Sequence, residues 1–247
     1  MHHSAQLNCA GFIFGASDVN KTIEIPTGGS AGTSPAPVAT VARTISSIAS
    51  TGTCANGLCS DVTLSSAIST ITTGVHVTWG TDNSAAFTAA ANACPPTPAI
   101  LNLLGNFTSK GCTIVIPSPG TAGTGDYMFT TGVVMSTQTS FSITGMGNSA
   151  RAENSTQSGV RLVTAMPITI LTVGISTTSN SNNFNSNFGG FQISDLSFID
   201  TSQNGSALGG LLIYNTSNAI ISDCDFENFG GQTADPANTG VFPNILA

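Results

Sequence analysis

Three acidic side chains near the end of the sequence have the spacing of an acid–base pair or of a cation site. In AIISDCDFEN (219–228), Asp223, Asp225 and Glu227 alternate with apolar residues. If this segment is a β-strand, Asp225 and Glu227 point to the same side, with origins about 6.6 Å apart. Carboxylates roughly 5–9.5 Å apart can hydrolyse a glycosidic bond. With Asp223 as a further oxygen ligand, the same pair could bind calcium. The competing interpretation is the solvated outer face of a strand.

Charged residues are scarce in this chain. Asp, Glu, Lys and Arg make up 7% of the 247 residues, against roughly 25% in a typical globular domain. Ser, Thr, Asn and Gly take their place, which favours short strands joined by turns over a helical bundle. The net charge is −7, and the cations are Lys21, Arg43, Lys110, Arg151 and Arg161. They form no basic patch, so the sequence argues against nucleic-acid binding.

The six cysteines suggest disulfides rather than a metal site. CANGLC (54–59) could close a small loop, and Cys94 and Cys112 flank a Pro-rich connection, so each is a plausible pair; free buried thiols are the alternative. A zinc site would need a second Cys/His pair at ligand spacing, and none is present. No secretory signal peptide is visible, and no apolar run approaches the roughly 18 residues of a membrane helix. An extracellular or cell-surface location therefore rests on composition and cysteines, and no membrane span is expected.

The chain before residue 112 mixes strand, loop and helix patterns. KTIEIP (21–26) predicts a strand, and the Gly-, Pro- and Ser-rich segment 27–40 predicts an exposed loop. A helix is expected within 81–94, with Asp82 or Asn83 as its N-cap. The narrow apolar stripe of this helix suits packing of one helix face over a flat end surface of the fold.

A second helix is expected to begin just after residue 60. Asp61 could serve as its N-cap, and Leu64, Ile68 and Ile71 then recur at helical spacing on one face. Together the two helices would form a cap region ahead of the strands.

After residue 112 the apolar pattern changes to a period of two. Short β-branched or aromatic runs, separated by turn residues, are found at 113–117, 132–135, 141–146, 159–163, 168–173, 191–198, 209–214 and 219–226. The intervals are too short for crossover helices, so a sandwich or a solenoid remains.

A repeat among these runs decides between the two. Aligning FSITGM, FQISDL and AIISDC stacks Ile143, Ile193 and Ile221, then Gly145, Asp195 and Asp223, then Met146, Leu196 and Cys224. Such stacking is typical of a β-solenoid, in which each coil buries the same positions as its neighbours. The column of Gly, Asp and Asp suggests a bend with positive φ. In the same register Asp200 falls opposite Asn228, and we interpret that column as structural too.

These features resemble the right-handed parallel β-helix proteins of the pectate-lyase-like superfamily. The resemblance rests on TDNSAAFTAAANAC as the helix that caps the N-terminal end, on GCTIVIPSPGTAGTGDYMFTTGVVM as an opening coil, and on the later repeats. It implies an all-β fold: a right-handed parallel β-helix with an N-terminal helical cap, incomplete at the C-terminus. The expected division is an irregular segment with a strand and a linker (1–60), a helical cap region (61–111) and β-helix coils (112–247).

The resemblance implies action on polysaccharide, yet the family's catalytic motifs are missing. Its lyases commonly use Arg or Lys as base with calcium, and this chain has no Lys or Arg after Arg161. Arg151 and Arg161 remain as possible bases, and Arg161, on an expected outward strand position, is the catalytic candidate of the two. Its hydrolases carry Asn-x-Asp, Asp-Asp, Gly-His-Gly and Arg-x-Lys segments, and none occurs here. Asp225 and Glu227 remain the catalytic candidates, and Asp223, Asp225 and Glu227 the calcium candidates.

Two functions stay open from the sequence. The first is an extracellular polysaccharide lyase or glycoside hydrolase whose catalytic coils lie downstream of this chain. The second is a non-catalytic glycan-binding module of the adhesin or tailspike type. FPNILA follows the last coil without a cap, so the open solenoid end is expected to continue in a longer chain or to meet another subunit.

Overall fold

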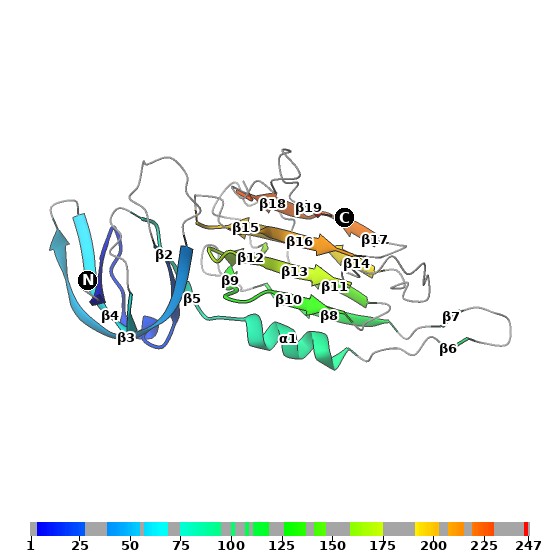
Figure 1. Ribbon diagram of the computed structural model, residues 1–247, viewed down its shortest axis with the longest axis horizontal. Coiled ribbons are helices and arrows are strands. Elements are labelled where there is room, and N and C mark those ends of the chain that lie inside the picture. The colour runs from blue at the N-terminus through cyan, green and yellow to red at the C-terminus, as the bar shows by residue number, and fades with distance from the viewer. Residues whose placement is uncertain are drawn as a thin grey trace.

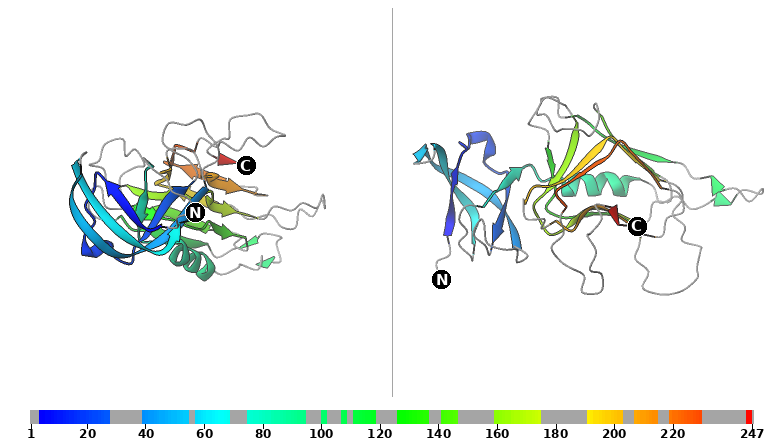
Figure 2. Two further views of the ribbon diagram at one scale, coloured as in Figure 1. Left: turned by 60° about the vertical axis from the view of Figure 1, so that its left-hand side comes forward. Right: turned by 90° about the horizontal axis from the view of Figure 1, so that it is seen from above.

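The computed structural model describes most of the strands and one helix. The described residues are 4–27, 39–54, 57–68, 75–94, 100–101, 107–108, 111–118, 126–136, 141–146, 159–174, 191–202, 207–214, 219–229 and 245–246. The chain forms an antiparallel sheet followed by three parallel sheets. The antiparallel sheet lies beside the group of parallel sheets (Figures 1 and 2). The all-β class expected from the sequence is therefore confirmed.

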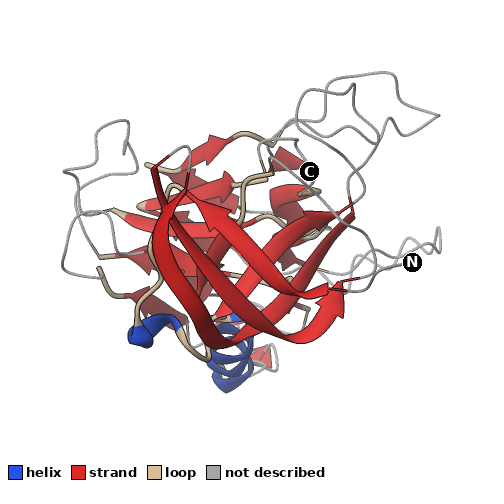
Figure 3. Cartoon of the chain, turned by 90° about the vertical axis from the view of Figure 1, so that its left-hand side faces the viewer, coloured by secondary structure: helices blue, strands red, loops and turns tan. Residues whose placement is uncertain are grey.

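The N-terminal part is a five-stranded antiparallel sheet (Figure 3). In the order β1-β4-β3-β2-β5, its strands are β1 (Ser4–Ala10), β4 (Gly57–Ile68), β3 (Ala39–Cys54), β2 (Thr22–Thr27) and β5 (Thr78–Gly80). A short 3-10 helix, η1 (Ala16–Asp18), precedes β2. Phe14, Ile23, Ile25, Ile45 and Val62 are buried in one core. Such a core shows that this part is an ordered sheet and not an irregular segment.

The helix expected after residue 60 is wrong over its described residues. Asp61 to Ile68 belong to β4, which pairs with both β1 and β3. Val62 and Leu64 are buried and alternate with the half-buried Asp61 and Thr63. Apolar residues four apart fit a helix and a strand alike, and the two neighbouring strands decide for the strand. The expected boundary between residues 60 and 61 falls inside β4, and Ile71 lies outside the described residues.

The strand predicted at 21–26 is confirmed as β2. Most of the loop predicted at 27–40 lies outside the described residues. β3 ends at Cys54 and β4 begins at Gly57, and the two residues pair in antiparallel strands. The side chains of Cys54 and Cys59 lie outside what the structure describes. Two more short strands, β6 (Ile100–Leu101) and β7 (Phe107–Thr108), pair with each other.

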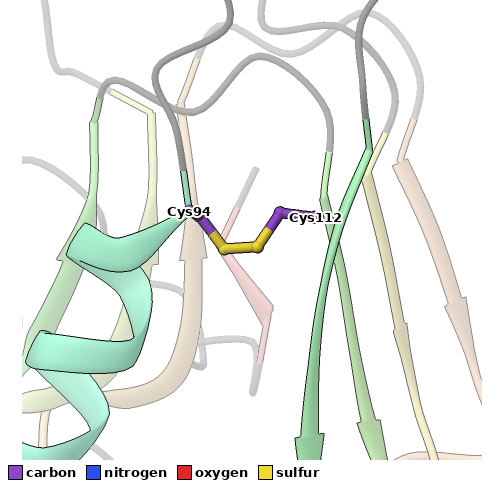
Figure 4. The surroundings of a disulfide bond; sticks show 2 residues. All are labelled: Cys94 and Cys112. Atoms are coloured by element: carbon purple, nitrogen blue, oxygen red, sulfur yellow. A yellow bond between two sulfur atoms is a disulfide. The ribbon is translucent and has the colours of Figure 1, made fainter.

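The expected capping helix is α1 (Ser84–Ala93), which lies under the first parallel strands (Figure 1). Asn83 occupies the N-cap position without a side-chain cap bond, and Asp82 supplies the acceptor instead: its Oδ1 accepts from Ser84 N at 3.0 Å. At the other end, a disulfide joins Cys94 to Cys112 (Figure 4). This bond confirms the predicted pair and ties the helix to the first parallel strand.

Three parallel sheets of four strands follow the helix. The first contains β8 (Cys112–Ile116), β11 (Phe141–Gly145), β14 (Phe191–Ser194) and β17 (Ala219–Ser222). The second contains β9 (Asp126–Met128), β12 (Val160–Thr164), β15 (Leu196–Asp200) and β18 (Asp225–Glu227). The third contains β10 (Val133–Met135), β13 (Thr169–Val173), β16 (Gly209–Ile213) and β19 (Ile245–Leu246). Successive strands enter the three sheets in rotation, and each pairs with the strand three places later.

The register of these sheets confirms part of the predicted stacking. Ile143 pairs with Ile193, and Ile193 with Ile221, as the repeat predicts. Inside the sheets, Phe198 and Phe226 stack with ring centroids 4.9 Å apart and planes 2° apart. Like residues repeat at one position because parallel strands in register place them directly above one another.

The column of Met146, Leu196 and Cys224 is wrong at its first member. Leu196 pairs with Val160 of β12, and Met146 is 54% exposed. β11 ends at Gly145 and β12 begins only at Val160, so Val160 and not Met146 lies opposite Leu196.

The bend column also differs at its first member. Asp195 and Asp223 have φ of 58° and 53°, as predicted, but Gly145 is an extended strand residue. Glycine is needed at this position for another reason, because a Cβ atom there would overlap the carbonyl oxygen of Asp195. Asn228, opposite Asp200 in the repeat, also has positive φ, at 64°.

Candidate functional site

The structure brings two of the predicted site residues into one column on the outer face of the second parallel sheet. Asp126 of β9 pairs with Arg161 of β12, Arg161 pairs with Ser197 of β15, and Ser197 pairs with Asp225 of β18. Their neighbours Leu162, Phe198 and Phe226 point inward to the main core. We call Asp126, Arg161, Ser197 and Asp225 the polar column. Neighbouring members are one strand spacing apart, about 4.8 Å.

Arg161 and Asp126 form an ion pair at one end of the column. Nε of Arg161 lies 3.3 Å from Oδ1 of Asp126, and the side chains are 33% and 41% exposed. The Nε atom is buried and makes no directed hydrogen bond, so the attraction is that of two charges. Burial raises the pKa of Asp126 above its ordinary value, and the Arg161 charge acts in the opposite direction. The charge of Arg161 is thus already paired with a carboxylate within the protein.

Asp225 occupies the other end of the column. Its Oδ1 accepts a hydrogen bond from the adjacent Phe226 amide at 2.9 Å, and the residue is half-buried. Between Asp225 and Arg161 stands Ser197, whose short side chain is fully buried. A ligand lying over the column would meet a carboxylate and a guanidinium on either side of this serine.

Glu227 belongs to the next column on the same face. It pairs with Ile199, and this column continues through the buried, apolar Val163 and Met128. Met128, Val163 and Ile199 form a small buried cluster of their own, and Gly80 of the antiparallel sheet lies against Met128. Asp225 and Glu227 therefore point to the same face, as their spacing predicts, but Glu227 lies beside an apolar strip.

Asp223 lies apart from this face. It is exposed at the bend between β17 and β18, with φ of 53°, a conformation that Asp tolerates by bonding its own backbone. Within the described ranges, no three His, Cys, Asp or Glu side chains gather as a group that could hold a metal ion. The calcium site at Asp223, Asp225 and Glu227 stays a prediction.

Sequence reasoning missed Asp126 and Ser197. Asp126 opens a three-residue strand whose length gives no clear alternation, and Ser197 is one hydroxyl among many. The usable signal was the register: once FQISDLSF and AIISDCDF are aligned, Ser197 falls opposite Asp225.

Sequence reasoning also missed Glu24. It is an acidic residue in the middle of the apolar strand TIEIPT, and such an interruption in a chain so poor in charge was a readable signal. The structure buries it completely, between the antiparallel sheet and the parallel sheets.

Comparison with protein family models gives no match, and comparison with curated proteins and with solved structures gives no significant match. Over the residues that the structure describes, no helix is long and apolar enough to cross a membrane.

Proposed function

We propose that the three parallel sheets are the faces of a right-handed parallel β-helix of the pectate-lyase-like type. The rotation of successive strands through the three sheets supports this architecture, as does pairing with the strand three places later. Parallel crossover connections are right-handed in about 98% of cases, which supports the hand. In this proposal α1 closes the N-terminal end of the helix, and the disulfide at Cys94 and Cys112 fastens it there.

The function we propose for the chain is binding of a polysaccharide or surface glycan along the outer face of β9, β12, β15 and β18. The observation that carries it is the polar column, which sets Arg161 and Asp225 on either side of Ser197. Charged side chains make the stronger hydrogen bonds to hydroxyl groups. The column runs across four neighbouring strands about 4.8 Å apart, and this length suits an extended ligand such as a polymer.

A polysaccharide lyase or hydrolase is the second candidate. The observation that favours it is the position of Asp225 and Glu227, which alternate on one face of β18 around the inward Phe226. Against a lyase, Arg161 already forms an ion pair with Asp126, and a guanidinium cannot accept a proton. An enzyme of this kind would need further catalytic groups besides Asp225 and Glu227.

The location and partners follow from the same proposal. The Cys94–Cys112 disulfide supports an oxidising, extracellular or cell-surface location. Among the described strands, β17 and β18 each pair with a single neighbour, and the inward Ile221 and Phe226 are only half-buried. These strands are where a further coil or a second copy of the chain would add.

Binding to a panel of neutral and acidic polysaccharides, by affinity electrophoresis with and without calcium, tests the proposed function. Asp225→Ala should weaken binding about tenfold or more, since a hydrogen bond to a charged group is worth about 1.5–3 kcal/mol. Gln192→Ala, an exposed polar residue on another sheet, is the matched control and should bind as the wild type. No binding to any polysaccharide, or equal binding by Asp225→Ala, would refute the proposal.

The enzyme candidate has its own readouts. Absorbance at about 235 nm follows unsaturated lyase products, and a reducing-end assay follows hydrolysis. Activity that disappears in both Asp225→Ala and Glu227→Ala, with folding intact, would favour the enzyme. Glycan binding without either signal would favour the non-catalytic module.

A further inference from the structure

The antiparallel sheet meets the parallel sheets at a small joint made by β2 and β5. Ala165, just after β12, donates its amide hydrogen to Oε2 of Glu24 at 2.6 Å. Thr78 Oγ1 donates a hydrogen bond to Oγ1 of Thr201, the residue just after β15, at 2.7 Å. We call Glu24, Thr78, Ala165 and Thr201 the joint. The two parts lie side by side in both the front view and the view from above (Figures 1 and 2).

Strand alternation explains why an acid stands here. Ile23 and Ile25 of β2 are fully buried in the core of the antiparallel sheet, so Glu24 between them points to the opposite face. That face is covered by the parallel sheets, and Glu24 is 0% exposed. Its Oε2 has the Ala165 amide, whereas its Oε1 is buried with no hydrogen-bond partner among the described residues.

The charged groups that act on Glu24 are two carboxylates, Asp82 and Asp200. Neither offers Glu24 a proton donor, because each carboxylate already accepts hydrogen bonds from other residues. Asp82 accepts from Ser84 and Thr130, and Asp200 accepts from the amides of Ser202 and Ala207 at 2.8 and 3.0 Å. A negative charge on Glu24 would thus be buried, half-satisfied and close to two other acids.

The proton equilibrium of Glu24 agrees with this geometry. Burial, first, and then the charges of Asp82 and Asp200 raise the pKa of Glu24 to about 8, against a lowering by the Ala165 hydrogen bond. When the joint separates, Glu24 meets water and its pKa returns toward the ordinary value of 4.5. The closed joint therefore holds a proton that the open joint releases.

We propose that the joint is a pH-sensitive connection between the antiparallel sheet and the parallel sheets, closed while Glu24 carries a proton and loosened when it is ionised. The sign follows from linkage. Below pH 4.5 both states are protonated and the joint is at its firmest. Between pH 4.5 and about 8 the open state alone loses its proton, so opening becomes more favourable as pH rises. Above about pH 8 both states are ionised and the effect levels off.

Hydrogen exchange of the Ala165 amide in the full chain tests the proposal directly, after division by the intrinsic exchange rate at each pH. In the wild type the opening constant should rise at least tenfold between about pH 5 and pH 8. Glu24→Gln, which keeps the shape of the protonated acid, should abolish this rise. Asp18 is another buried acid next to the antiparallel sheet, and its pKa lies below its ordinary value. Asp18→Asn is therefore the control and should leave the rise of the opening constant with pH intact.

The wild type alone gives a second measurement, which holds even if Glu24→Gln folds poorly. The carboxyl carbon-13 shift of Glu24 should titrate with a midpoint near 8. A midpoint near the ordinary value, an Ala165 opening constant flat from about pH 5 to 8, or the same rise in Glu24→Gln would each overturn the proposal.

Discussion

The backbone of Gly145 touches the backbone of Asp195 so closely that a Cβ atom on Gly145 would overlap the Asp195 carbonyl oxygen. Gly145 ends β11, and Asp195 forms the bend between β15 and β14, the strand that pairs with β11. The two segments meet here without an intervening side chain. Since the obstacle is backbone, it cannot move aside without shifting a strand.

Gly145→Ala should therefore destabilise the protein by about 1–3 kcal/mol, the usual cost of overpacking. Denaturant unfolding measures the change. Gly209→Ala is the matched control in another parallel strand, where the nearest atom to an added Cβ is Thr169 Oγ1 at 3.8 Å, an ordinary contact. Equal losses in the two variants would show that the close approach at Gly145 is not responsible.

Asp223 offers a test of the positive-φ bend, because it is exposed and has φ of 53°. Asp223→Ala should lower the free energy of unfolding by about 1 kcal/mol, because Ala keeps the Cβ atom but lacks the polar side chain with which Asp bonds its own backbone in the left-handed conformation. Asp223→Gly should be tolerated, since glycine adopts this conformation freely. Thermal unfolding of both variants gives the comparison, and Ala tolerated as well as Gly would contradict the argument.

The Cys94–Cys112 disulfide closes a loop with a sequence separation of 18. Replacing both cysteines by serine should cost about 3 kcal/mol in oxidising buffer, because the unfolded chain regains the freedom that the loop removed. Hydrogen exchange should show the loss first in α1 and β8, which the bond joins. Cys224→Ser, at a free and half-buried cysteine, is the control. A loss spread evenly over the antiparallel sheet would contradict a local role.

Asp82 fastens the start of α1 to the loop after β9. Burial acts to raise its pKa, but hydrogen bonds from Ser84 and Thr130 prevail, and the pKa of Asp82 lies below its ordinary value of 3.8. Asp82→Ala should destabilise the protein by about 1–2 kcal/mol at neutral pH, as the loss of a helix cap does.

The pH dependence of this loss has a definite sign. A carboxylate with a lowered pKa contributes stability that is complete above 3.8 and disappears as pH falls through the folded value. The difference between wild type and Asp82→Ala should thus shrink below about pH 4 in urea unfolding curves. A difference that grows in acid would show that Asp82 acts through something other than its charge.

The parallel strands could be predicted from the sequence because their cause is local and repeated. Ile143, Ile193 and Ile221 recur at one position of a period-two pattern, and the same alignment predicts the register that the structure has. The helix at 84–93 was predictable from its own cap residues. The strand β4 was not, because Leu64 and Ile68 satisfy both periods and the strands on either side settle the choice.

The candidate site was predictable only in pieces. Asp225 and Glu227 follow from alternation along one strand, and both lie on the face that was expected. Arg161 and Asp126 join Asp225 only through the pairing of the four strands β9, β12, β15 and β18, which no single segment specifies. Whether a carboxylate stands over open sheet or beside a covered apolar strip depends on what packs against that sheet.

By itself the sequence determined the strand pattern, the repeat, the capping helix and one disulfide, since each depends on residues near one another or on repeated positions. The tertiary structure decided that Glu24 is buried against Ala165 and that Arg161 pairs with Asp126. It also decided that Val160, and not Met146, lies opposite Leu196. These relationships join segments that are distant in the chain. Their energies come from burial and from charges across space, which local pattern does not encode.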